Sequence, residues 1–283
     1  MELQTILRAS AILGGLGLTF GVMIALANRK FRVVEDPRVD GVVALLPGSN
    51  CGACGQAGCR AFGEALVRGE VQPAGCTVMT PDDRSDVASF LGVDAGSATK
   101  RVARLQCAGG ADVAPRRAAY RGLESCAAAV GVGGGGKACA WGCVGLADCA
   151  VSCDFDAITM NANGLPVVDP EKCTACNDCV EACPLGLFTL MPLDHHLLVQ
   201  CKSLLEGDAA TGVCSVACNA CGRCVADAAA GLIEMKNGLA VIDYAKVELA
   251  APEAAGRCPT GAILWLEGGQ FAEARLPEPA LAG

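Results

Sequence analysis

The spacing of its cysteines is the clearest chemical signal in this chain. One compact run has four cysteines separated by two, two and three residues and followed by a proline; its members are Cys173, Cys176, Cys179 and Cys183. This spacing is typical of a 4Fe-4S cluster, and in two-cluster proteins the fourth thiolate of each run binds the other cluster. A run with wider gaps precedes it and consists of Cys139, Cys143, Cys149 and Cys153. The two runs together predict a pair of clusters.

Exchange of the fourth ligands defines the expected ligand sets of this pair. The first expected set is Cys139, Cys143, Cys149 and Cys183. The second expected set is Cys153, Cys173, Cys176 and Cys179. Asp154 stands where a proline usually follows the fourth cysteine. Since proline only stiffens that turn, we expect Cys153 to remain a ligand.

A separate set of four cysteines lies nearer the N-terminus: Cys51, Cys54, Cys59 and Cys76. Glycines at 52, 55 and 58 allow tight turns that aim backbone N–H groups at sulfur. Residues 60–68 read as a short helix that packs Phe62 and Leu66 beneath the site. Zinc also accepts four thiolates, so a zinc site is the alternative to a 4Fe-4S cluster here.

The last part of the chain repeats the central pattern at an offset of 75 residues, in reduced form. Cys214, Cys218 and Cys224 fall on the first three members of the wide run. Ala228 replaces the fourth, and the equivalent of the compact run keeps only Cys258. The cysteines that remain predict a single cluster held by Cys218, Cys221, Cys224 and Cys258.

The vacated second site of this tail repeat is expected to be filled by Ala228, Val247 and Leu249 as ordinary core. Four further cysteines are left over: Cys107, Cys126, Cys201 and Cys214. They are either a fifth cluster site or buried, reduced thiols, which are common. Because the repeat aligns Cys214 with Cys139, Cys214 also competes with Cys221 for the tail cluster.

Composition agrees with an intracellular metal protein. The 20 cysteines are too closely spaced for an open disulfide framework, and aromatic residues make up only 4% of the chain. The net charge of −8 argues against nucleic acid as a partner. A local excess of cations around Arg116 and Arg117 is either a solvated helical face or a docking patch for an acidic redox partner.

These sites need elements that position them, and one of these is an anchor. Residues 9–27 are uncharged and mostly apolar, which suffices for one membrane-spanning helix. Arg29 and Lys30 follow at once, so the positive-inside rule puts the C-terminal body in the cytoplasm and the helix in the inner membrane. A cleaved signal peptide is the alternative, because residues 25–27 resemble a cleavage site.

The expected fold class is α+β: a transmembrane helix, a small four-cysteine domain and two tandem bacterial-ferredoxin-like modules, the second degenerate. Strand-like segments at 157–160 and 165–169 predict a hairpin, residues 188–190 a further strand, and 232–235 with 239–243 a second hairpin. The predicted division is a helix at 1–28, an N-terminal 4Fe-4S domain at 29–90, a connecting segment at 91–136, a two-cluster module at 137–192, a connector at 193–213, a single-cluster module at 214–270 and a tail at 271–283.

The order of these motifs resembles the B subunit of the Rnf complex. The stretches that carry the resemblance begin at Leu45 (LLPGSNCGACGQAGC), Ala119 (AYRGLESCAAAV) and Lys137 (KACAWGCVGLADCAVSCDFDAI) and end with KCTACNDCVEACP. The resemblance implies electron transfer from reduced ferredoxin to integral-membrane and NAD-reactive partner subunits. It also implies that ions, Na+ or H+, move in those partners while this chain carries electrons.

Other functions fit parts of the pattern. A polyferredoxin subunit of a membrane hydrogenase or dehydrogenase has similar cysteine runs, and an iron–sulfur sensor or corrinoid-protein activator has a domain like that of residues 51–76. A zinc-loaded interaction module is the plainest alternative. We find no nucleophile–base pair, P-loop or dinucleotide fingerprint, so we expect no catalytic residue in this chain.

Overall fold

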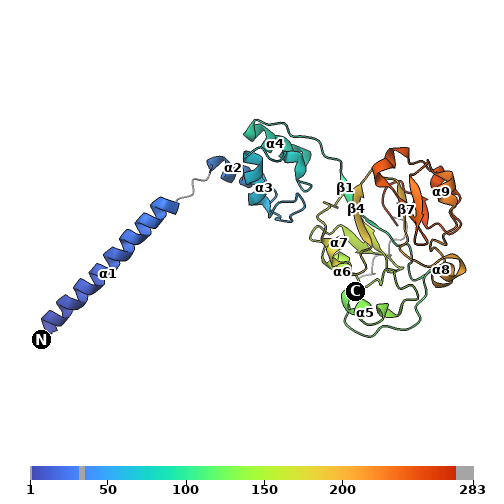
Figure 1. Ribbon diagram of the computed structural model, residues 1–283, viewed down its shortest axis with the longest axis horizontal. Helices are drawn as coiled ribbons and strands as arrows, with labels where there is room; N and C mark the ends of the chain where they lie inside the picture. The colour runs from blue at the N-terminus through green and yellow to red at the C-terminus, as the bar shows by residue number, and fades with distance from the viewer. Residues whose placement is uncertain (1, 32–35, 272–283) are drawn as a thin grey trace, which may run out of the picture.

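The computed structural model of the chain describes residues 2–31 and 36–271. Figure 1 shows an isolated helix, then a small helical domain, then two neighbouring modules of short strands and helices. Of the predicted tail at 271–283, residues 272–283 lie outside the described residues.

Helix α1 (Glu2–Phe31) extends away from the rest of the chain (Figure 1). From Gln4 to Phe31 it is long and apolar enough to cross a membrane, and its most hydropathic window is not buried against the protein. Apolar side chains such as Leu13 and Leu18 stay exposed, at 70% and 72%, which a soluble surface rarely tolerates in a continuous stretch. The helix therefore indicates association with a membrane.

The N-terminal domain packs three helices around one apolar core. Val42, Phe62, Leu66 and Val87 lie at its centre, and Phe62 and Leu66 are buried as predicted. The helix predicted at 60–68 is confirmed within one residue at each end. The helices are α2 (Pro37–Leu45), α3 (Cys59–Val67) and α4 (Pro81–Leu91), with a 3-10 turn η1 (Pro73–Gly75).

The central module is built on two antiparallel strand pairs. β1 pairs with β4, and β2 pairs with β3 in the predicted hairpin. Their bounds are β1 (Arg101–Leu105), β2 (Ile158–Met160), β3 (Pro166–Val168) and β4 (Phe188–Pro192). The helical elements are α5 (Cys126–Gly131), η2 (Gly134–Gly136), α6 (Asp148–Val151) and α7 (Asp178–Ala182).

Strand β1 corrects one expectation from sequence. The predicted division places residues 101–105 in a connecting segment, with a helical face as one interpretation of its cations, but they form an extended strand. Val102, Ala103 and Leu105 are buried, because the strand pairs with β4 and packs against the core of the central module. The central module therefore begins at or before Arg101.

The tail module repeats this arrangement. β5 pairs with β8, and β6 pairs with β7 in the second predicted hairpin. The strands are β5 (Leu197–Val199), β6 (Ile233–Lys236), β7 (Leu239–Ile242) and β8 (Ile263–Trp265). The helices are α8 (Gly207–Val213), α9 (Arg223–Asp227) and α10 (Glu253–Gly256), with the 3-10 helix η3 (Tyr244–Leu249). β5 and α8 occupy the segment predicted as a connector at 193–213.

The filling of the vacated tail site differs from the prediction. Leu249 is 46% exposed. It belongs to the 3-10 helix η3, none of whose residues is fully buried. Ala228 does pack against the tail core, together with Tyr244. The Tyr244 ring also stacks on His195 at a centroid distance of 5.6 Å. Val247 is only partly buried, so of the three predicted residues only Ala228 packs against the tail core.

The two modules are joined by backbone hydrogen bonds. Ala108 N–H donates to the carbonyl of Gln200 (3.0 Å), and Ser215 N–H donates to that of Val113 (3.0 Å). Ala114, from the central segment, is buried inside the tail core. These contacts fix the loop after β1 against the loop after β5.

Candidate iron–sulfur centres

One predicted quartet of the central module is brought together as expected. Cys153, Cys173, Cys176 and Cys179 line a single cavity with an empty volume of about 310 Å³. Ala103 of β1 and Ile158 of β2 form part of its wall. Cys153 thus lies beside three cysteines of the compact run, although Asp154 follows it in place of the usual proline.

The other central cavity brings together a set of cysteines that differs from the predicted quartet. The cavity beside α6 is lined by Cys126, Cys143, Cys149 and Cys183, with an empty volume of about 370 Å³. Cys139, expected in this set, does not line it. The structure therefore brings Cys126, and not the predicted Cys139, together with the other three cysteines.

The position of α5 explains this exchange. The Asp148 carboxylate accepts hydrogen bonds from the Ser125 hydroxyl (3.0 Å) and from the backbone N–H of Ala127 (3.1 Å). Asp148 begins α6, so these bonds hold the first turn of α5 against the first turn of α6. Cys126 and Cys149 are thereby brought to the same cavity, although the sequence separates them by more than twenty residues.

Cys139 instead lies between the two modules. Four thiols line a cavity of about 310 Å³: Cys107, Cys139, Cys201 and Cys214. Cys107 follows the end of β1 by two residues, as Cys201 follows β5, and Cys139 and Cys214 are equivalent in the repeat. Each module therefore contributes the same pair of positions. We call these four residues the inter-module quartet.

Hydrogen bonds connect the inter-module quartet to a cysteine set on either side. The backbone N–H of Cys143 donates to Cys107 Sγ at 3.4 Å, while the Cys143 thiol lines the neighbouring cavity. In the tail, burial raises the pKa of Cys201 to about 11, and a hydrogen bond from the backbone N–H of Cys218 opposes that rise. Because the repeat aligns Cys143 with Cys218, the two links are equivalent.

The tail quartet lies in one cavity as predicted. Cys218, Cys221, Cys224 and Cys258 line an empty volume of about 340 Å³. Cys214 lines the inter-module cavity and does not compete with Cys221. All twenty cysteines lie in the described part of the chain, and Cys221 is the only exposed one. This module thus presents a cysteine site at its surface.

The N-terminal set gathers on the core of its own domain. Burial raises the pKa of the Cys76 thiol, and Cys54 and Cys51 are close enough to add to that rise electrostatically. Cys54 and Cys59 both pack against the core that contains Cys76. The side-chain carbonyl of Asn50 accepts a hydrogen bond from Cys59 N–H at 2.9 Å, which fixes the start of α3.

Short helices begin at most of these sites. A thiol occupies the first or second residue of five helices: Cys59, Cys126, Cys149, Cys179 and Cys224. The free N–H groups of a helix N-terminus favour negative charge, such as that of a thiolate-bound cluster. Before three of them the backbone is left-handed, at Ala147, Asn177 and Gly222, which turns the chain sharply around the site.

The donor sets suit a 4Fe-4S cluster better than a single ion. A tetrahedral zinc site brings its sulfur atoms to about 3.8 Å from one another, since Zn–S bonds are about 2.3 Å. Among the described residues, no group of three or more candidate ligands converges closely enough to hold a single metal ion. The thiols instead surround four cavities of similar size, and all are free of disulfide bonds. An iron–sulfur cube fits this arrangement.

Thiol protonation points the same way. Burial raises the pKa of Cys143 to about 12 and that of Cys179 to about 12, with nearby cysteines adding to each rise. Four buried thiolates could not stay charged side by side on their own. Bound iron offsets that charge and keeps coordinating thiols deprotonated.

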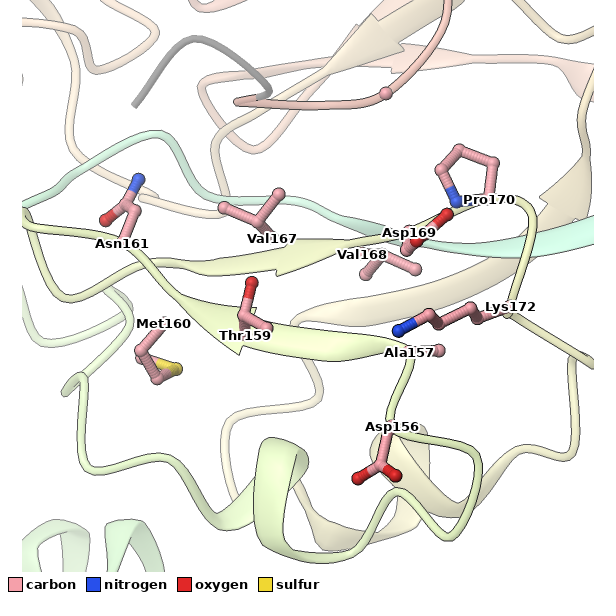
Figure 2. A pocket seen from close by; sticks show the side chains of 11 residues that line it. Asp156, Ala157, Thr159, Met160, Asn161, Val167, Val168, Asp169, Pro170 and Lys172 are labelled. Carbon is pink, nitrogen blue, oxygen red and sulfur yellow. The ribbon is translucent and has the colours of Figure 1, made fainter. Parts of the chain in front are cut away.

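A further cavity lies away from the cysteine sets. It follows the β2–β3 hairpin, has an empty volume of about 1010 Å³ and includes no cysteine among its described lining residues. Figure 2 shows Thr159 and Val167 on its strands, with Asp156 and Lys172 toward one end. It takes no part in the thiolate chemistry.

The predicted docking cations have mixed surroundings. The Arg116 guanidinium donates to the carbonyls of Gly135 (2.9 Å) and Val144 (2.7 Å), a structural role that the sequence did not indicate. Arg117 is exposed. Docking of an acidic partner at this pair stays a prediction.

Comparison with known proteins agrees with this chemistry. The family model described as "Putative Fe-S cluster" matches residues 46–78, and "4Fe-4S binding domain" matches residues 166–189. Fold and thiol sites together define an iron–sulfur protein of the electron-transferring class.

Three relatives extend the match to 92% of the chain, and each is the B subunit of its complex. That of the Na(+)-translocating ferredoxin:NAD(+) oxidoreductase complex of Acetobacterium woodii is 43% identical, with 78% of its own length covered. That of the ion-translocating oxidoreductase complex of Methanosarcina acetivorans is 34% identical (98% covered). That of the proton-translocating ferredoxin:NAD(+) oxidoreductase complex of Clostridium ljungdahlii is 37% identical (93% covered). The chain belongs to this family, the B subunits of Rnf-type ion-translocating oxidoreductase complexes.

Proposed function

We propose that this chain is the membrane-anchored electron wire of an Rnf-type complex. It takes electrons from reduced ferredoxin and passes them to membrane partners, and the complex couples this flow, with NAD as the other redox partner, to Na+ or H+ transport. The observation that carries the proposal is the series of cysteine quartets running from the exposed tail module to the domain beside α1.

Five 4Fe-4S clusters are proposed, each held by one quartet. The ligand sets are Cys51, Cys54, Cys59 and Cys76; Cys126, Cys143, Cys149 and Cys183; Cys153, Cys173, Cys176 and Cys179; Cys218, Cys221, Cys224 and Cys258; and Cys107, Cys139, Cys201 and Cys214. When bound, each cluster supplies a one-electron carrier whose potential depends on nearby charge, hydrogen bonds and exposure. The protein supplies the spacing, the insulation and the docking faces.

The direction of the wire follows from exposure and from the anchor. Cys221 is exposed, so the tail module offers the shortest approach for a diffusing ferredoxin. The domain that contains Cys76 follows α1 in the chain and is suited to meet integral-membrane subunits. The basic residues Arg29 and Lys30 at the end of α1 support a cytoplasmic body in the inner membrane.

Membrane vesicles test this function. Vesicles from cells with the chain are expected to reduce NAD with reduced ferredoxin, and vesicles from a deletion strain are expected to lose that activity and regain it with the wild-type gene. Oxidation of NADH by an artificial acceptor serves as the control, since it bypasses the wire and reports that the other subunits are assembled. Undiminished ferredoxin-dependent NAD reduction without the chain would refute the proposal and favour another membrane oxidoreductase.

A further inference from the structure

Charged side chains are unevenly distributed over the cysteine cavities. Lys137 and Lys202 both line the inter-module cavity, and no carboxylate is among its described lining residues. Among the described residues that line the tail cavity, none has a charged side chain. The described lining of the cavity that contains Cys126 includes one charged residue, Asp148, which is acidic. The site between the modules thus stands in a more positive environment than either neighbour.

Lys137 is held between two sites by backbone carbonyls. Its Nζ donates to the carbonyl of Cys143 at 2.6 Å and also to that of Gly109. Gly109 follows Cys107 of the inter-module quartet, whereas the Cys143 thiol lines the next cavity. The ammonium therefore connects the loops of two adjacent sites and is only half-exposed.

Lys137 brings its positive charge to both sites. Its side chain lines the same cavity as Cys139 and Cys214, one from each module, and its Nζ donates a hydrogen bond to the carbonyl of Cys143. A positive charge in the wall of a cluster cavity favours the extra negative charge of a reduced cluster.

Lys202 approaches the same cavity from the tail module. Its Nζ donates to the carbonyl of Gly186, in the loop that follows Cys183 of the central module. The Lys202 bond therefore connects the tail module to the central module, whereas the Lys137 bonds connect the loops of two neighbouring cysteine sites. Arg104 is a buried cation near a different quartet: it interacts with Cys173 and does not line the inter-module cavity.

We propose that Lys137, supported by Lys202, sets the reduction potential of the inter-module cluster and raises it above that of the tail cluster. With clusters bound, this order of potentials would favour holding an electron between the modules, where its negative charge would lie beside the fixed ammonium of Lys137. This inference rests on the proposed presence of a cluster at that site.

Redox titration followed by EPR of the anaerobically purified, full-length protein tests this role. The C214A variant first identifies which signal belongs to the inter-module cluster. In K137M, the equilibrium constant for reducing that cluster is expected to fall at least ~10-fold, which lowers a one-electron midpoint potential by ~59 mV. K137R is expected to keep the wild-type potential. K246M is the matched control, because Lys246 also donates to a carbonyl, that of Gly231, but lines no described cysteine cavity.

The outcomes separate the two proposals. An unchanged potential in K137M overturns the role of the lysine while leaving the cluster in place. A C214A variant that loses neither iron nor signal overturns the fifth site itself, and the inference with it. If K137M loses iron from this site, K202M decides, since it leaves both Lys137 bonds intact. A lowered potential in K202M then supports the proposal, and an unchanged one overturns it.

Discussion

Paired alanine substitutions distinguish the observed grouping of cysteines from the one that the spacing predicts. Cys139 and Cys214 line the same cavity, whereas Cys126 lines a different one. C139A/C214A therefore damages one site, and C126A/C214A damages two. The predicted grouping reverses this result, because it joins Cys126 with Cys214 and assigns Cys139 elsewhere. Alanine is used since a serine oxygen can still bind iron.

The expected magnitudes follow from the number of quartets. Five filled sites correspond to ~20 iron atoms per chain, four to ~16 and three to ~12, at four irons per cube. Each single variant, C126A, C139A or C214A, is expected to contain ~16. C139A/C214A is expected to stay at ~16, and C126A/C214A to fall to ~12.

Iron and acid-labile sulfide, measured per chain after anaerobic purification, provide the assay. Circular dichroism of the same samples serves as the control for folding, because a collapsed module would lose several clusters together. A C139A/C214A protein with as little iron as C126A/C214A would contradict the grouping. So would single variants that lose no iron, since the four thiols would then be ordinary buried cysteines.

Three further results are expected. Arg104 is 3% exposed, and its Nε has no hydrogen-bond partner among the described residues. Its positive charge interacts with Cys173. R104M should therefore lower the midpoint potential of the cluster proposed at the Cys173 quartet, as measured by EPR titration. G145A should destabilise the central module by at least ~1–2 kcal/mol in denaturant titrations, from the left-handed backbone alone. At Gly145 the backbone has φ +76°, and a new Cβ would lie 2.7 Å from the carbonyl oxygen of Gly164. G186A is its control, at φ +56° with open space, and equal losses would contradict the steric reasoning. Removal of iron should abolish cooperative unfolding of both modules by calorimetry, because four thiol-lined cavities in small cores would lose the group that fills them; an unchanged transition would show that the cores do not depend on metal.

Local patterns predicted the parts of the structure that local forces determine. Helix α3 follows from apolar residues at helical spacing, and both hairpins follow from short strand-like segments separated by a turn. The placement of Cys153 with the compact run follows instead from the rule that two-cluster runs exchange their fourth ligands. For the helix and the hairpins, the residues that decide the structure are neighbours in sequence.

The parts that the sequence did not reveal depend on distant contacts. Strand β1 pairs Leu105 with Phe188, and no short window contains both partners. The location of Cys126 depends on bonds from the first turn of α5 to Asp148. The repeat did contain a usable signal, however. Cys214 is not needed by the complete tail quartet, so its equivalent, Cys139, could have been assigned to the space between modules.

The inter-module quartet also determines an order of maturation. Its members come from positions 107, 139, 201 and 214, so the site is incomplete until most of the chain has been synthesised. The quartets that end at Cys76, Cys179 and Cys183 can be complete before that point. A cluster at the inter-module quartet could therefore form only after residue 214 has been synthesised, later than clusters at the quartets that are complete earlier in the chain.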